Sequence, residues 1–193
     1  MEEVKIISVA ILASGTGTNA KALVEHFEGV REIDIVYIGS NNSSAGVLEI
    51  ASSAGISSSC FSKSDLQSGV VLQDLKSRGI DYIFLCGFLL KIRGDLIAAF
   101  EGRILNIHPS LLPKFGGKGM YGLNVHGAVL ESGDQSSGMT IHKVSAEYDE
   151  GDIVFQCSSD ISMCKTVEEI ANVVLALEHE YYPRIAEAFI KNS

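Results

Sequence analysis

Apolar and polar positions alternate along this chain in a pattern that predicts a layered α/β protein. Continuous apolar runs of strand length are separated by segments in which apolar residues recur at helical spacing, which is typical of a parallel sheet covered on both faces. The predicted buried strands are 6–12, 33–38, 81–86 and 103–107. The predicted helices between them are 19–27, 44–54, 66–78 and 94–100. Up to residue 107 the chain therefore consists of successive βα units.

The pattern changes after Pro113. Segment 114–123 is rich in glycine, so we expect a mobile loop near the active end of the sheet. The serine-rich stretch 57–64 is expected to be a connection, and Gly55 and Gly79 are expected to end helices in the left-handed conformation. Thr166 and Glu169 form a capping box that begins a final helix running to about residue 189. The remaining predicted elements are a helix at 123–132 and β segments at 139–144 and 153–157.

Composition limits the classes of function that need to be considered. A chain of 193 residues with 46% hydrophobic content is expected to form one domain, 1–193, with a sizeable core. Its formal net charge of -9 disfavours a nucleic-acid or anionic-membrane surface. The N-terminus lacks the pattern of a signal peptide and no apolar run reaches membrane-spanning length, so we expect a cytoplasmic protein. The cysteines lack the spacing of a zinc site, and no metal is expected: Cys60, Cys86, Cys157 and Cys164.

Asn106 and His108 carry the most specific chemistry, because they place a carboxamide and an imidazole on alternate positions at the end of an apolar strand. Side chains alternate faces along an extended segment, so both point the same way while Ile107 points into the core. Pro109 biases His108 toward extended backbone and ends the strand. The pair predicts an oxyanion site, although an isolated buried Asn and His more commonly connect a loop to the core.

A second candidate site is the glycine-rich loop 13–19, which follows the first predicted strand and begins the first predicted helix. Free N–H groups and the dipole at a helix start suit a phosphate. Gly15, Gly17 and Ala20 also match a relaxed dinucleotide fingerprint, but the second strand ends with neither an acidic residue for a ribose nor a cation for its phosphate. A lone phosphomonoester is the favoured ligand, and a turn that binds nothing is the alternative.

The acidic segment 147–152 lies between the two late β segments. If it folds over the end of the sheet, one of its carboxylates contacts His108 and favours the imidazolium form. Taken alone, the segment is a solvated turn. The spacing does not identify which acid would be the partner.

Together these motifs resemble the glycinamide ribonucleotide formyltransferases of purine biosynthesis over nearly the full length of the chain. The matching segments occur in the family's order and at its approximate spacing: 14–19, 86–92, 102–113, 118–122, 148–151 and 178–179. The resemblance implies a single Rossmann-like formyltransferase domain over 1–193. Its sheet would be mostly parallel with helices on both faces, followed by antiparallel strands and a long final helix. The active cleft would lie at the carboxyl ends of the strands.

The resemblance also implies a reaction, the transfer of a formyl group from 10-formyltetrahydrofolate to the amine of 5-phosphoribosylglycinamide. Asn106 and His108 would stabilise the oxyanion of the tetrahedral intermediate, and His108 would also transfer a proton. Asp149 would hold that imidazole protonated, so we expect it to raise the pKa of His108. Neither a metal nor a covalent enzyme intermediate is implied.

Further residues are assigned to the two substrates by the same resemblance. The phosphoribosylglycinamide would contact Gly17, Thr18, Asn19 and Glu178. The folate would lie against an apolar wall and a loop whose backbone meets the pterin: Leu89, Leu90, Lys91, Ile92, Asn106, Ser145, Ala146, Glu147, Tyr148 and Asp149. Leu90 departs from the family pattern, because many members carry a basic residue there.

Three alternatives remain at this point. Methionyl-tRNA formyltransferases add a C-terminal domain for tRNA, and formyltetrahydrofolate deformylases add an N-terminal regulatory domain, so the length of the chain disfavours both. A deformylase core without its extra domain is the closest alternative, and it would release formate without an acceptor. A non-catalytic nucleotide-binding module is disfavoured by the joint presence of Asn106, His108 and Asp149. We expect small-molecule substrates, no nucleic-acid or membrane partner, and a monomer or homodimer.

Overall fold

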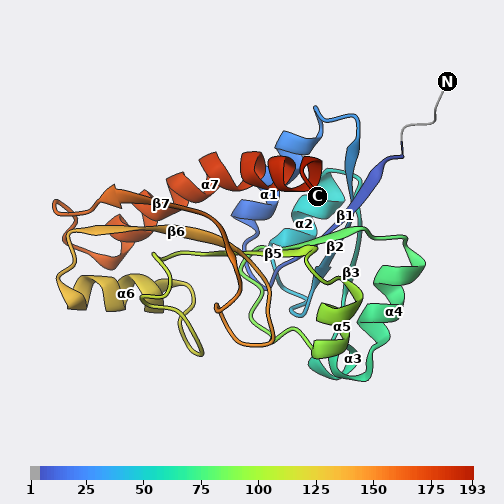
Figure 1. The fold of residues 1–193 in the computed structure, drawn as a ribbon, viewed down its shortest axis with the longest axis horizontal. Helices are drawn as coiled ribbons and strands as arrows, with labels where there is room; N and C mark the ends of the chain where they lie inside the picture. The colour runs from blue at the N-terminus through green and yellow to red at the C-terminus, as the bar shows by residue number, and fades with distance from the viewer. Residues whose placement is uncertain (1–4) are drawn as a thin grey trace. The chain divides into compact units, whose positions relative to one another are not determined.

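Residues 5–193 of the chain are described, from a computed structural model (Figure 1). These residues fall into two units, one ending at Ile104 and the other running from Leu105 to Ser193. Each unit is described by itself below.

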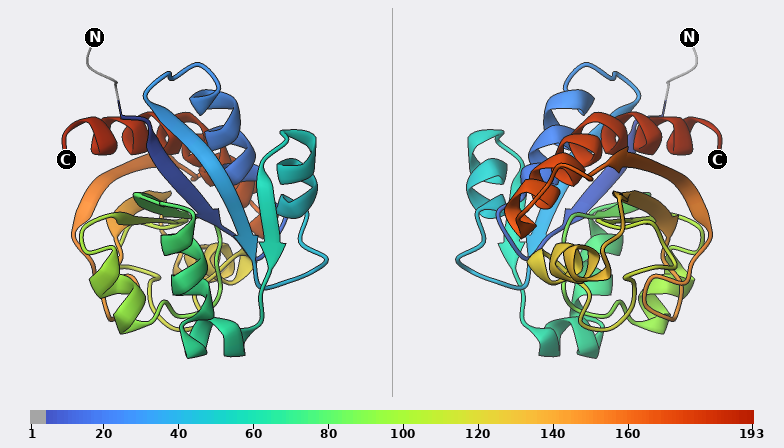
Figure 2. Two further views of the ribbon diagram at one scale, coloured as in Figure 1. Left: turned by 90° about the vertical axis from the view of Figure 1, so that its right-hand side faces the viewer. Right: turned by 90° about the vertical axis from the view of Figure 1, so that its left-hand side faces the viewer.

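The first unit contains a parallel sheet. β2 (Ile33–Ser40) pairs with both β1 (Ile7–Leu12) and β3 (Ser57–Cys60), and β1 also pairs with β4 (Tyr82–Leu85). Figure 2 shows β1, β2 and β3 side by side. Residues Val9 to Leu12 of β1 are fully buried, which explains why this strand is a continuous apolar run.

The helices of the first unit alternate with its strands, as the sequence pattern predicts. They are α1 (Thr18–Phe27), α2 (Val47–Ser53), α3 (Lys63–Ser68), α4 (Val70–Ser77) and α5 (Gly94–Ala99). Gly55 and Gly79 both have a φ of 68°, so the expected left-handed residues after α2 and α4 are confirmed.

Two expectations for the first unit are wrong. The continuous helix expected over 66–78 is two helices, because Gly69 adopts a left-handed φ of 85° and separates α3 from α4. The serine-rich stretch 57–64 is more than a connection. It contains strand β3 and the capping box of α3, in which Ser62 and Asp65 cap each other's backbone N–H groups.

The second unit contains antiparallel strands and two helices. β6 (Ser136–Lys143) pairs antiparallel with β5 (Ile104–His108) and with β7 (Ile153–Asp160). α6 (Leu123–Ser132) and the 25-residue α7 (Val167–Lys191) pack against each other, and α7 also packs on β6. The predicted capping box of Thr166 and Glu169 is confirmed at the start of α7.

The fold class predicted from the sequence is confirmed, with parallel strands first, antiparallel strands late and a long final helix. The burial of the strands explains this order, since both faces of β1 are covered whereas β7 has only half-buried and exposed positions. Among the helices of residues 5–193, none has the length and apolar character that crossing a bilayer requires.

Candidate active site

Strand β5 ends at His108, immediately before Pro109, as predicted. Ile107 is buried in the core, and Asn106 and His108 lie opposite His142 and Thr140 of β6 in the antiparallel register. His108 is itself buried at 4% exposure. The strand therefore holds a buried imidazole and a half-buried carboxamide at its end.

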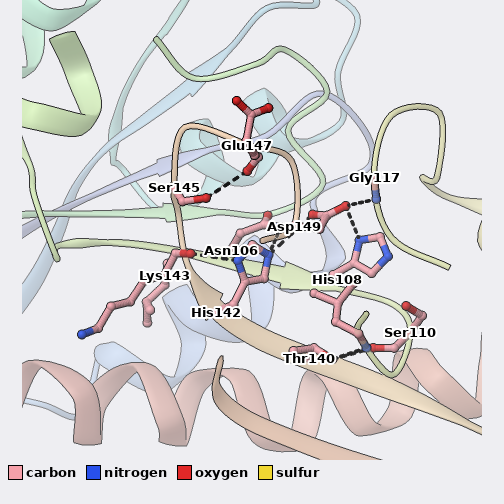
Figure 3. Close-up of polar contacts among 12 residues, drawn as sticks. Asn106, His108, Ser110, Gly117, Thr140, His142, Lys143, Ser145, Glu147 and Asp149 are labelled. Atoms are coloured by element: carbon pink, nitrogen blue, oxygen red, sulfur yellow. Dashed lines mark hydrogen bonds and ion pairs between the residues drawn. The ribbon is translucent and has the colours of Figure 1, made fainter. Parts of the chain in front are cut away.

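Asp149 lies between two imidazoles (Figure 3). Its Oδ2 is 3.6 Å from His108 Nδ1, and its Oδ1 is 3.6 Å from His142 Nε2. The backbone N–H of Gly117 donates to Oδ2 at 2.8 Å. Within the acidic segment 147–152, Asp149 is thus the carboxylate that the tertiary structure places beside His108.

The glycine-rich segment 114–122 contacts the same cluster through its backbone. His108 Nε2 lies 2.8 Å from the carbonyl oxygen of Phe115, which can only accept, so Nε2 carries a proton. Gly116 is tightly enclosed, because a Cβ at this position would lie 2.5 Å from a side-chain carbon of Leu112. The segment therefore fixes one ring nitrogen of His108 and leaves Nδ1 facing Asp149.

A buried polar network holds the turn that follows His108. The hydroxyl of Thr140 donates to the carbonyl oxygen of Ser110 at 2.6 Å and accepts from the N–H of Leu112 at 3.1 Å. The side-chain amide of Gln156 donates to the Thr140 hydroxyl at 2.8 Å and to the carbonyl oxygen of Leu112 at 3.0 Å. Because each of these bonds ends on β6, on β7 or on the turn, the turn is tied to the sheet beneath it.

The pKa of His108 is lowered, and this corrects an expectation from the sequence. Burial is the largest influence, because it disfavours the charged imidazolium. The carboxylate of Asp149 and the carbonyl oxygen of Phe115 raise the pKa of His108, but burial and the neighbouring His142 together lower it by more. Burial therefore favours the neutral form of the His108 ring. The Asp149 carboxylate would stabilise the positive charge of the ring after protonation.

Asp149 is held ionised. Burial alone would raise the pKa of its carboxyl, but the interactions with His142, His108 and the Gly117 N–H together outweigh burial and lower it. The site thus combines a buried neutral base with a fixed negative charge.

Sequence reasoning missed His142. Its ring is 2% exposed, and Nε2 lies 3.0 Å from Asn106 Nδ2. The available signal was the alternation along β6, in which Thr140 and His142 share one face while Met139 and Ile141 are core residues on the other. That alternation shows which face of β6 carries His142, but it does not show which residue His142 contacts. Only the pairing of β6 with β5 reveals the contact with Asn106.

The predicted phosphate loop lies in the first unit, at the start of α1. Gly17 has a left-handed φ of 79°, and a Cβ there would lie 2.7 Å from Val47 Cβ, so only glycine fits. No side chain caps the N-terminus of α1, which begins at Thr18 and continues with Asn19. Ser14 fixes the loop by donating to Asn41 Oδ1 at 2.5 Å and accepting from the Leu89 N–H at 2.9 Å.

The remaining predicted binding residues occupy varied positions. In the segment after β4, Leu89 and Lys91 are exposed, Leu90 is half-buried and Ile92 is buried. In the loop between β6 and β7, Ser145 donates to the carbonyl oxygen of Glu147 at 3.1 Å, and the exposed residues are Ala146, Glu147 and Tyr148. Glu178 lies on the buried face of α7 at 7% exposure. In the described part of the chain, no group of three His, Cys, Asp or Glu residues is arranged to hold a metal ion.

Comparisons with known proteins bear on this geometry. A family model described as formyl transferase matches residues 7–186. The chloroplastic phosphoribosylglycinamide formyltransferase of Arabidopsis thaliana is 41% identical, over 93% of this chain and 64% of the relative. The corresponding protein of Vigna unguiculata is 39% identical, over 93% of this chain and 60% of the relative. This chain therefore spans less than two thirds of the length of these plant relatives.

Solved structures give the same result. Glycinamide ribonucleotide transformylase 1 from Symbiobacterium toebii aligns with a TM-score of 0.88 and 33% identity, over 97% of this chain and 89% of that one. Phosphoribosylglycinamide formyltransferase from Brucella melitensis aligns with a TM-score of 0.86 and 36% identity, over 96% of each chain. The resemblance inferred from the motifs is confirmed, and the chain belongs to the formyl transferase family.

Proposed function

We propose that this protein transfers a formyl group from 10-formyltetrahydrofolate to the amine of 5-phosphoribosylglycinamide, a step of purine biosynthesis. The observation that carries the proposal is the cluster formed by the buried His108 and the half-buried Asn106 and Asp149 in a chain of the formyl transferase family. The names of the plant relatives and of the aligned structures support this choice of substrates. The family match from 7 to 186 supports treating 1–193 as one formyltransferase domain.

The chemical step proceeds by addition and elimination at the formyl carbon. The substrate amine forms the new C–N bond, the carbonyl oxygen becomes an oxyanion, and the bond to N10 of the folate then breaks. Asn106 Nδ2 and the His108 ring stabilise the oxyanion, since polar groups fixed in a site with little water need no reorganisation as charge develops. The products are the formylated amide and tetrahydrofolate.

A proton must move from the amine to N10 during this reaction, and His108 carries it. Nε2 donates to the Phe115 carbonyl oxygen, so Nδ1 is the ring nitrogen that takes the proton. Burial keeps the pKa of His108 low and the resting ring neutral, as a base requires. Asp149 Oδ2, 3.6 Å from Nδ1, stabilises the imidazolium until it returns its proton to the leaving nitrogen. Because the amine is itself the nucleophile, the proposal requires no metal.

Binding residues are assigned separately for the phosphate, the amine and the folate. The start of α1 offers backbone N–H groups and the positive end of a helix dipole to the phosphate at Gly17, Thr18 and Asn19. Glu178 supplies a carboxylate for the glycinamide amine. We assign the folate to the wall and loop residues Leu89, Leu90, Lys91, Ile92, Asn106, Ser145, Ala146, Glu147, Tyr148 and Asp149.

Compartment and assembly are also proposed. The structure shows all four cysteines as free thiols, which supports a reducing compartment, and we propose the cytoplasm. The plant relatives are described as chloroplastic, so an organelle is the alternative that microscopy of the tagged protein would reveal. We propose a monomer or homodimer that binds small molecules, and sedimentation would distinguish the two states.

An absorbance assay for deformylated folate tests the function. The protein is supplied with 10-formyltetrahydrofolate, with and without 5-phosphoribosylglycinamide. Product that forms only with the acceptor supports the transferase. Equal product without the acceptor would identify a deformylase, and no product in either case would favour a non-catalytic binding module.

A further inference from the structure

His142 is a buried residue beside the proposed catalytic cluster that the proposed mechanism leaves without a role. It lies on β6 directly opposite Asn106 of β5, at 2% exposure (Figure 3). The β6–β7 ladder has a register shift between Ile141 and His142. Bulges of this kind re-aim the side chains beside them and are frequent next to active sites. The ring therefore has a fixed direction, toward Asn106 and Asp149.

The backbone decides which ring nitrogen of His142 carries a proton. Nδ1 lies 2.9 Å from the carbonyl oxygen of Lys143. A carbonyl oxygen can only accept, so Nδ1 must donate and must be protonated. A neutral ring protonated at Nδ1 leaves a lone pair on Nε2. Nε2 can then only accept.

This lone pair sets the orientation of the Asn106 carboxamide. Asn106 Nδ2 is 3.0 Å from His142 Nε2, and only the amide nitrogen can donate to it. One N–H of Nδ2 is therefore engaged by His142, and the other remains to stabilise an oxyanion. The opposite orientation would place the amide oxygen, a second acceptor, against the lone pair of the ring.

We propose that His142 is a positioning residue whose neutral, Nδ1-protonated ring fixes Asn106 with its amide nitrogen as the oxyanion donor. The part concerning the oxyanion rests on the function proposed above, whereas the part concerning the ring and the amide does not. Asp149 is the competing group, because its carboxylate attracts a proton to Nε2. Its Oδ1 is 3.6 Å from Nε2, beyond hydrogen-bonding distance, whereas Asn106 is within it.

Nitrogen-15 NMR of the full-length protein tests the ring directly and requires no turnover. The chain has five histidines, so labelling histidine alone gives a spectrum simple enough to assign, and the signals that disappear in His142→Gln are those of His142. The expected result at pH 8 is a protonated Nδ1 and an unprotonated Nε2. A proton on Nε2 would overturn the proposal.

A matched pair of substitutions tests whether the ring acts through Asn106. The terminal oxygen of His142→Gln reaches the position of Nε2 and can accept from Asn106, whereas His142→Asn is shorter and reaches only the position of Nδ1. We expect kcat to stay within about tenfold of wild type for His142→Gln and to fall about 10²-fold for His142→Asn, with little change in KM for either substrate. The same two substitutions at the half-buried His26 of α1 control for histidine replacement in general.

The same substitutions in an Asn106→Ala background complete the test. If His142 acts by orienting Asn106, His142→Asn costs little further activity once the carboxamide is absent. An undiminished 10²-fold loss in that background would overturn the proposal and assign His142 to another partner. The wild-type protein could show the expected protonation of the His142 ring and yet transfer no formyl group. That result would refute the proposed function, but it would leave the orientation of the Asn106 amide unaffected.

Discussion

Polar groups are arranged differently around His108 in the second unit and at the start of α1 in the first. Around His108, the ring nitrogens, the Asp149 carboxylate and the Thr140 hydroxyl all interact with protein groups. At the start of α1, Gly17 is held in place by packing, and no side chain caps the helix. The difference separates a cluster of preorganised side chains from the helix start that we propose binds the phosphate.

The surroundings of His108 and the loop at the start of α1 also differ in solvent exposure. His108 is almost fully buried, and burial is what lowers its pKa, whereas Thr16 and Thr18 of the loop are exposed. Substitutions around His108 should therefore act on the rate of the chemical step. Substitutions in the loop should act on substrate affinity.

The largest effect is expected for His108→Ala. Loss of both the proton carrier and the oxyanion partner should lower kcat by about 10²- to 10⁴-fold while leaving the affinity for 5-phosphoribosylglycinamide nearly unchanged. Steady-state kinetics together with calorimetric binding of that substrate would check both quantities. A large loss of affinity with kcat preserved would reverse the assignment of the two regions.

Asp149→Asn should come next, with a fall in kcat of about 10²-fold and a change in pH dependence. Asp149 raises the pKa of His108 against the effect of burial, so removing its charge lowers that pKa further. Since the neutral ring is the base, the acidic limb of the kcat/KM profile should move to lower pH. A profile that overlays that of the wild type would contradict the partnership.

Thr140→Val should change the stability of the protein more than it changes kcat. The substitution keeps the shape of the side chain but leaves the Leu112 N–H without its acceptor, which should lower the free energy of unfolding by about 2 kcal/mol. Thr140→Ser keeps the hydroxyl and serves as the matched control in urea titrations. A Thr140→Val variant as stable as the wild type would show that the hydroxyl network contributes little to stability.

The smallest effect is expected in the loop. Gly17→Ala introduces a Cβ 2.7 Å from Val47 at a φ of 79°, so the loop must shift, and KM for 5-phosphoribosylglycinamide should rise about tenfold with kcat little changed. Gly15→Ala is the control, because a Cβ there meets nothing within 4 Å. A rise in KM of the same size for Gly15→Ala would argue against the packing explanation.

Local signals in the sequence predicted the elements that local chemistry controls. Helix Leu123–Ser132 has the predicted bounds, β5 ends before Pro109, and α7 begins at the capping box of Thr166. The break between α3 and α4 at Gly69 was not predicted. Glycine is compatible with both helical and left-handed backbone, so its presence alone does not show that a helix ends there. The β3 edge strand was missed because serine is not typical of strands, and its place is set by pairing with β2.

By itself, the sequence determined the α/β class, the strand that carries Asn106 and His108, and the family, because periodicity, proline and motif order are local or linear properties. Only the tertiary structure decided that Asp149 is the acid beside His108 and that His142 contacts Asn106. It also decided that the pKa of His108 is lowered rather than raised. These outcomes depend on strand register and on the exclusion of water, which arise from packing between segments far apart in the chain.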